Sequence, residues 1–147
     1  MRGFKGHLKL LVLHIISQEP SHGYSIMKKI SELIGAEPPS SGALYPILAS
    51  LKRRKFIEEQ VEGRRKVYSL TKKGKKFLSE NEKNLKEALL AAERLKEFYE
   101  LGGKELKNVA VLIFKNLSHL SSSQKDQLKT TLKELERKIQ RIIYGGE

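Results

Sequence analysis

Residues 40–55 read SSGALYPILASLKRRK, and the fold prediction depends on this stretch. Its aliphatic residues recur at the spacing of one face of an α-helix, so we expect that face to be buried. They are Leu44, Ile47, Leu48 and Leu51. The opposite face carries small and basic residues, which allow a backbone to come close to a charged molecule. The stretch therefore predicts a half-buried helix with a small, cationic outer face.

Composition restricts the class of protein. The 147 residues are 39% hydrophobic, which suits a packed core in one domain of ordinary size or in two small ones. The absence of cysteine excludes disulfides and thiolate metal sites. No apolar run approaches the roughly 18 residues of a membrane span, so no membrane is expected as a partner and a cytoplasmic location follows by default.

The charge of the chain is unevenly distributed. The net charge is +12, and residues 1–76 carry sixteen Lys or Arg against six acids, whereas residues 77–147 carry thirteen against eleven. A basic excess in one half is expected of a surface that binds a polyanion such as DNA. A basic surface that is merely solvated would give the same balance, so the order of the elements has to decide.

The elements around residues 40–55 predict a winged helix-turn-helix. Apolar spacing predicts a first helix over 7–17, buried on most sides, and a second that is capped by Ser21 and closed by Gly35. Residues 56–62 and 65–71 then read as a β-hairpin with a basic tip. In a winged helix-turn-helix the third helix enters a DNA major groove, and a basic wing tip reaches the backbone or the minor groove.

Three clusters of residues also occur in a specific order between residues 8 and 74. They are His22-Gly23-Tyr24, then Ser40 with Gly42-Ala43-Leu44-Tyr45-Pro46, then Arg65-Lys66 with Tyr68, Leu70, Thr71 and Gly74. Together they resemble the PadR-like family of transcriptional regulators. This resemblance implies a winged-helix DNA-binding domain followed by dimerising helices, usually in a repressor that in some members is released by a small ligand. Family members commonly carry threonine at the position of Ala43, so one hydroxyl contact is missing here.

The second half of the chain reads as long helices. Thr71 can cap a helix over 72–101 that Gly102-Gly103 ends, and this length predicts a lever toward a partner. Residues 104–120 form a second amphipathic pattern. Ser121-Ser122-Ser123 then offers an N-cap, and Ser123 with Asp126 resembles a weak capping box. The last helix has the a/d spacing of a coiled-coil seam. This spacing suits packing on the 72–101 helix of the same chain, helix-on-helix packing in a dimer, or a separate two-stranded zipper. The predicted dimer contacts are Leu85, Leu89, Ala92, Leu95, Tyr99, Leu128, Leu132, Leu135, Ile139 and Ile142.

The predicted DNA contacts lie on the third helix and at the wing tip, where small, hydroxyl and basic side chains can meet bases or phosphates. They are Ser40, Ser41, Gly42, Ala43, Tyr45, Pro46, Ala49, Ser50, Arg53, Arg64, Arg65 and Lys66. Pro46 should delay the start of the helix or bend it, because proline lacks a backbone donor. Tyr24 and Tyr68 are expected to pack in the core, as are Phe98, Tyr99 and Phe114.

The fold class is therefore mainly α (α+β), with a winged helix-turn-helix domain over 1–74 and a helical dimerisation domain over 75–147. The predicted function is a homodimeric, sequence-specific regulator of double-stranded operator DNA, with a small-molecule effector left open. The alternatives are a non-specific architectural DNA-binding protein and a winged-helix module that binds another protein. No cofactor is expected. His7 and His14 share a helical face without an acidic or cysteine partner, so no metal site is expected, and no catalytic constellation suggests an enzyme.

Overall fold

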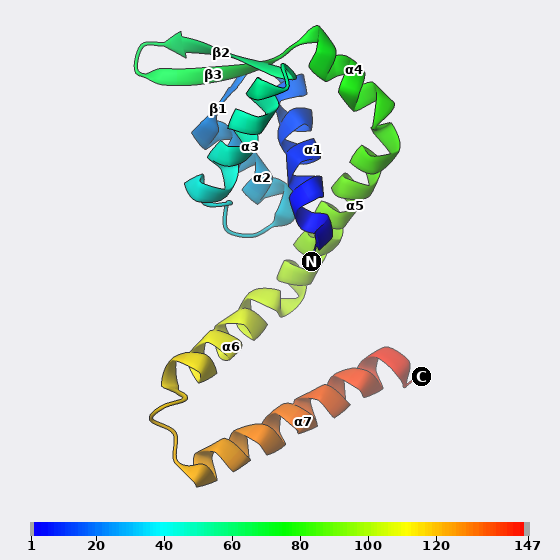
Figure 1. Ribbon diagram of the computed structural model, residues 1–147. Helices are drawn as coiled ribbons and strands as arrows, with labels where there is room; N and C mark the ends of the chain where they lie inside the picture. Colours follow the sequence, from blue (N-terminus) through cyan, green and yellow to red (C-terminus); the bar gives the residue numbers. More distant parts are fainter. Residues whose placement is uncertain (1, 146–147) are drawn as a thin grey trace. The chain divides into compact units, whose positions relative to one another are not determined.

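The computed structural model describes residues 2–145, with side chains from residue 6 onward. It is mainly helical with a small antiparallel sheet, which confirms the predicted fold class (Figure 1). The elements in order are α1 (Arg2–Gln18), β1 (Ser21–His22), α2 (Gly23–Ile34), α3 (Ser41–Arg53), β2 (Ile57–Glu62), β3 (Arg65–Leu70), α4 (Lys72–Glu80), α5 (Glu82–Phe98), a π-helical turn (Tyr99–Gly103), α6 (Lys104–Asn116) and α7 (Ser122–Tyr144).

The chain forms two compact units, which divide between Gly103 and Lys104. The first unit holds α1 to α5 and the sheet, and the second holds α6 and α7. The sequence predicts a boundary after residue 74 between a DNA-binding part and a dimerising part. This functional division stays a prediction. As compact bodies, α4 and α5 belong with the elements that precede them.

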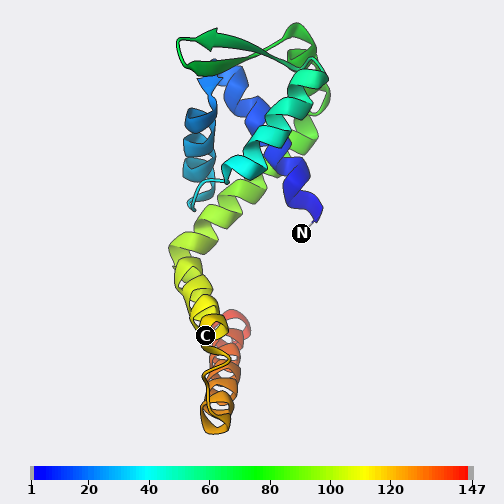
Figure 2. The ribbon, with the colours of Figure 1, turned by 60° about the vertical axis from the view of Figure 1, so that its left-hand side comes forward.

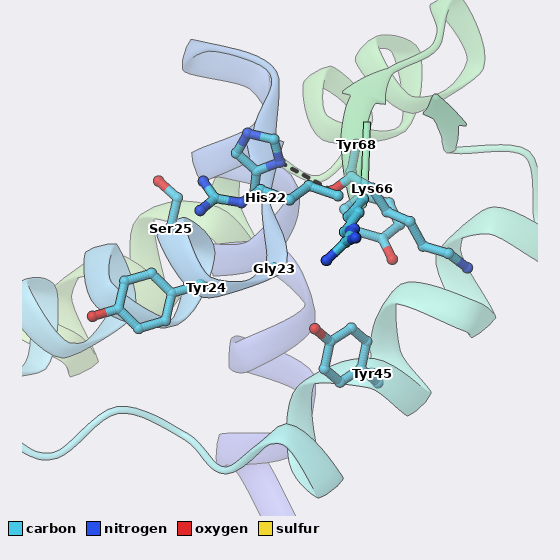
Figure 3. A pocket seen from close by; sticks show the side chains of 9 residues that line it. His22, Gly23, Tyr24, Ser25, Tyr45, Lys66 and Tyr68 are labelled. Atoms are coloured by element: carbon cyan, nitrogen blue, oxygen red, sulfur yellow. Dashed lines mark hydrogen bonds between the residues drawn. The ribbon is translucent and has the colours of Figure 1, made fainter. Parts of the chain in front are cut away.

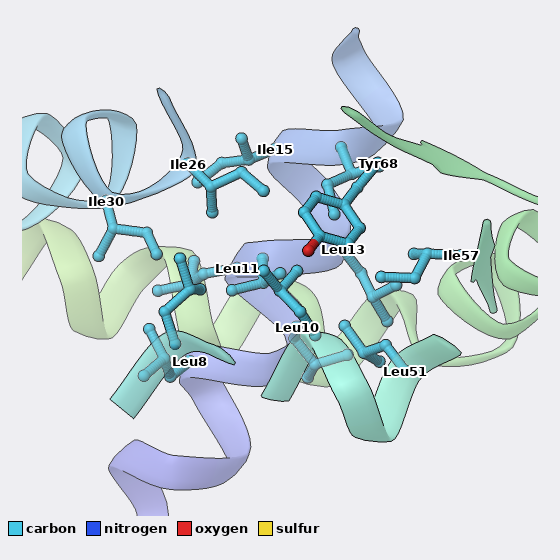
Figure 4. Close-up of a cluster of buried hydrophobic side chains, with 14 of the residues drawn as sticks. Leu8, Leu10, Leu11, Leu13, Ile15, Ile26, Ile30, Leu51, Ile57 and Tyr68 are labelled. Carbon is cyan, nitrogen blue, oxygen red and sulfur yellow. The ribbon is translucent and has the colours of Figure 1, made fainter. Parts of the chain in front are cut away.

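The core of the first unit is built around α1. This helix contacts α2 and α5, which also contact each other, while α3 covers another side (Figures 1 and 2). Seven aliphatic side chains of α1 are buried, as the nearly continuous apolar run predicts. Figure 4 shows this cluster, in which side chains from α1, α2, α3 and the hairpin interdigitate. The core therefore fixes the positions of α2, α3 and the hairpin.

The ends of α2 and α3 show which local signals hold. Gly35 ends α2 in the left-handed region with φ of 63°, as expected of a closing glycine. The Oγ of Ser40 accepts from the backbone N–H of Ala43 and caps α3. The predicted Ser21 cap is wrong, because Ser21 lies in β1 and its hydroxyl donates to the carbonyl of Glu19. The residue at the N-cap of α2 is His22, whose side chain makes no cap bond.

The sheet has the strand order β1-β3-β2, all antiparallel. The predicted hairpin is present, with Glu62 opposite Arg65 across the two-residue turn Gly63-Arg64. Gly63 has φ of 60°, the conformation that a type II′ hairpin turn requires at its first position. The short strand β1 was not expected. It pairs Ser21 with Tyr68, and so ties the start of α2 to the wing.

The expected single helix over 72–101 is wrong. The helix breaks at Asn81, whose φ of −110° and ψ of 23° lie outside the helical range, and whose side-chain amide donates to the carbonyl of Phe77. After the break, α5 packs against α1 and α2 and buries Ala88 and Ala92 in their core. This segment is therefore part of the winged-helix body and does not act as a free lever.

In the second unit, α6 and α7 have no buried residue. α6 ends at Asn116, four residues earlier than expected. The cap of α7 is Ser121, which exchanges hydrogen bonds with Gln124 in a capping box, so the predicted pairing of Ser123 with Asp126 is wrong. Most apolar residues of both helices are exposed, and the rest are half-buried.

Candidate nucleic-acid interface

The two faces of α3 are as the sequence predicts. Leu44, Leu48 and Leu51 are buried, and Ile47 is partly buried against the same core. The outer face is exposed and consists of Gly42, Pro46, Ala49 and Arg53. This face is free of large aliphatic side chains, so a nucleic-acid backbone or base edge can approach it closely.

Pro46 lies inside α3, which starts at Ser41, so the helix does not start late, and the alternative of a bend at Pro46 stays a prediction. In a helix the missing donor of Pro46 would have bonded to the carbonyl of Gly42, four residues earlier. Gly42 is exposed in the first turn of α3, where water can reach the backbone.

The structure brings the predicted DNA contacts onto one part of the first unit. Eleven of the twelve are exposed, and Ser50 is half-buried. Within residues 6–145, the guanidinium groups of Arg53, Arg64 and Arg65 have no carboxylate within 4.0 Å. These three arginines are thus available to an external anion.

A hollow of about 570 Å³ lies where the start of α2, the side of α3 and the wing meet (Figure 3). Gly23 allows this meeting, because a Cβ on it would lie 3.0 Å from the hydroxyl of Tyr45. The Nδ1 of His22 lies 3.3 Å from the carbonyl of Lys66 and links α2 to the wing. Cationic side chains and tyrosine hydroxyls can donate hydrogen bonds, and phosphate oxygens accept them, so this concave surface suits a phosphate group.

Two tyrosines near this hollow differ in burial. Tyr68 is 4% exposed, which confirms the prediction that it packs in the core. Burial is the larger cause that raises the pKa of its phenol, and the nearby Glu59 carboxylate is the smaller one. Tyr24 is 76% exposed, so the expectation that it packs in the core is wrong. The helical period contained this information: Tyr24 precedes the buried Ile26 by two residues, about 200° around the helix.

One acidic side chain that the sequence analysis did not single out lies between α3 and the wing. The Oε2 of Glu59 lies 3.2 Å from the Nζ of Lys52, and its Oε1 lies 3.2 Å from the Nζ of Lys66. Hydrogen bonds from Lys52 and then from Lys66 lower the pKa of the Glu59 carboxyl. No local pattern could have revealed this bridge, because it joins a helix to two strands.

The residues predicted to form the dimer contact divide into two groups. In the first unit, Ala92 is buried in its own chain, and the half-buried Leu85, Leu89 and Leu95 pack on the same core. Tyr99 is half-buried in the π-helical turn. In α7, Leu128 is half-buried, and the other four are exposed. Those four are Leu132, Leu135, Ile139 and Ile142.

The described residues show neither a membrane-spanning helix nor a metal-binding cluster. None of the helices within residues 2–145 combines the length and the apolarity that crossing a membrane requires. Over the same part of the chain, histidine and acidic residues form no group of three or more placed to hold a metal ion.

Phe98 and Phe114, which were expected in the core, are instead 45% and 76% exposed.

Comparison with known proteins agrees with this geometry. The sequence model of the transcriptional regulator PadR-like family matches residues 12–80. A PadR-like transcription factor from Bacteroides fragilis, whose X-ray structure is known, is 31% identical; the match covers 62% of this chain and 91% of that one, with a TM-score of 0.50. The chain belongs to the PadR-like family of transcriptional regulators.

Two further proteins resemble this PadR-like chain. The crystal structure of TA0346 from Thermoplasma acidophilum is 30% identical, covers 68% of this chain and 97% of that one, and has a TM-score of 0.50. The transcriptional regulator YqjI of Escherichia coli is 37% identical over 93 residues, which are 62% of this chain and 44% of YqjI. The chain thus spans less than half the length of this curated relative.

Proposed function

We propose that this PadR-like chain is a homodimeric repressor that binds operator DNA. The observation that carries the proposal is the exposed outer face of α3, with the unpaired cations Arg53, Arg64 and Arg65 on it and at the adjoining wing tip. Small residues on a recognition helix permit close approach to base edges, and the arginines supply charge for phosphates.

The proposed docking places α3 in a major groove. Its N-terminal residues, from Ser41 to Tyr45, meet base edges, because recognition helices read bases mainly from their N-terminal part. The wing tip lies against the flanking backbone or minor groove. Two protomers address half-sites about 34 Å apart, roughly one turn of DNA. Repression follows from blocking access to the promoter.

The second copy is proposed to dock on α7. The apolar positions of α7 alternate at four and three residues, and four of the five seam residues are exposed, with none buried. A seam of that spacing is complementary to an identical helix, and a two-fold dimer uses the same patch on both protomers. The dimer also explains why an otherwise hydrophilic helix exposes a row of leucine and isoleucine.

The test of DNA binding uses the purified full chain at modest salt. The probes are fragments from upstream of its own gene and duplexes selected from a random pool, with random duplex as competitor. We expect the selected duplexes to bind at least 100-fold more tightly than random duplex. Absence of binding to every probe would overturn the proposal, and equal affinity for all duplexes would assign the chain to architectural DNA binding.

Replacement of Arg53 by alanine is expected to weaken binding equally on selected and random duplexes. Arg53 lies in the last turn of α3, away from the N-terminal part that reads bases. Loss of one phosphate contact should reduce affinity about five- to tenfold at 0.1 M salt and make the salt slope shallower by about one. Arg94→Ala, an exposed arginine of α5, is the matched control. A loss confined to selected duplexes would make Arg53 a base reader.

A further inference from the structure

The groove between α3 and the wing contains an unusual charge arrangement for a surface that binds DNA. Among the described residues that line it, Glu59 is the one carboxylate, while Lys52, Arg53 and Lys66 are cations. A carboxylate at this place repels phosphates of any DNA and therefore lowers affinity regardless of sequence. Its presence requires a physical explanation.

The geometry shows that Glu59 is held between two structural elements. The register of the hairpin pairs Glu59 with Tyr68, which places Lys66 diagonally across on the same face of the sheet. Lys52 reaches the same carboxylate from the last turn of α3. The Glu59 side chain is 16% exposed, whereas those of Lys52 and Lys66 are 52% and 58% exposed. The carboxylate is thus the shielded centre of a three-residue bridge.

A contribution to folding does not account for this bridge. Ion pairs whose lysines are more than half exposed contribute little to stability because water and salt screen them. The carboxylate is ionised at neutral pH, since the two lysines lower the pKa of Glu59. What the bridge does change is the availability of two lysine ammonium groups, which would otherwise be mobile and unpaired on the DNA-facing surface.

We propose that Glu59 determines specificity by holding Lys52 and Lys66 in the groove, away from the phosphates of arbitrary DNA. This inference rests on the proposed function. In sequence-independent binding, affinity rises with the number of phosphates that free cations reach, in any placement of the duplex. In an operator complex the contacts of α3 with bases fix the position of the duplex on the protein. Freeing the two lysines therefore adds less to the affinity for operator DNA than to the affinity for random DNA. Glu59 thereby widens the difference between operator and random DNA.

The test compares Glu59→Gln with Glu58→Gln. Both changes remove one negative charge from β2, but Glu58 is exposed on the opposite face of the strand. The probes are a random-sequence duplex and the tightest duplex selected from a random pool, titrated between 50 and 200 mM salt. For Glu59→Gln we expect random-duplex affinity at 50 mM to rise about three- to tenfold, with a salt slope steeper by about one to two. The selected duplex should gain about twofold or less, and Glu58→Gln should change both by less than about twofold.

A second arm tests the route through the lysines. In a Lys52→Gln/Lys66→Gln background, Glu59→Gln should have no more effect than Glu58→Gln, because no lysine remains to be released. A full effect in that background would overturn the proposal. An equal gain in affinity for both duplexes would also overturn it, because that result indicates a general charge effect. A loss of affinity confined to the selected duplex would overturn it too, because Glu59 would then read cytosine amino groups. If the unmodified chain binds neither duplex, the proposed function itself fails.

Discussion

Gly74→Ala is expected to lower the free energy of unfolding by about 3 kcal/mol, enough to unfold a large fraction of a marginally stable chain. Gly74 lies buried in the first turn of α4, and a Cβ on it would lie 2.0 Å from the carbonyl oxygen of Phe56. That oxygen cannot move away freely, because it accepts from the backbone N–H of Thr71. Denaturant unfolding followed by circular dichroism measures the loss.

Gly6→Ala provides the matched control for this prediction. Gly6 lies in α1, and a Cβ there would have no neighbour within 4 Å. Alanine should therefore stabilise the helix by about 0.5 to 1 kcal/mol. If Gly74→Ala unfolded at the same denaturant concentration as the unmodified chain, the close approach of α4 to the base of the wing would be refuted.

Leu135→Lys is expected to convert the proposed dimer to monomers. Leu135 occupies the middle of the α7 seam and is 41% exposed in the single chain. The two-fold axis brings the change into the interface twice, so a cost of about 2 kcal/mol per copy gives about 4 kcal/mol, or roughly 1000-fold in the dimer Kd. Sedimentation velocity over a range of concentrations measures this shift, and DNA binding should weaken with it.

Thr130→Lys introduces the same residue on the opposite side of α7. Five residues before Leu135, it lies about 140° around the helix, and the dimer should be unaffected. If Leu135→Lys sedimented as a dimer, the interface would move to α6, whose exposed apolar residues include Leu106, Leu112 and Phe114.

The sequence predicted α3 and the hairpin well because their signals are local. The buried face of α3 follows from the spacing of its leucines, and its Ser40 cap bonds a backbone group three residues away. Gly63 supports the turn by its own conformation. Each of these features depends on residues within about one helical turn or one strand pair, so the pattern alone carries the information.

The errors arose where local signals compete. Ser21 is a good cap residue, yet its backbone pairs with Tyr68 of β3, and strand pairing outweighed capping. The expected long helix breaks at Asn81. After the break, α5 packs on α1 and buries Ala88 and Ala92. The spacing of apolar residues along α4 and α5 is the same for one helix or two, so the pattern could not distinguish them.

Local spacing and capping were sufficient for the order of three helices and a hairpin, the inner and outer faces of α3, and the basic tip of the wing. The Glu59 bridge to Lys52 and Lys66, the approach of Gly74 to Phe56 and the packing of α5 depended on how separate elements meet. These contacts join residues on different helices and strands, so their distances follow from packing the whole core and cannot be read from any one segment. The tertiary structure also leaves the α7 seam without a buried residue, and a second copy is the cover we propose.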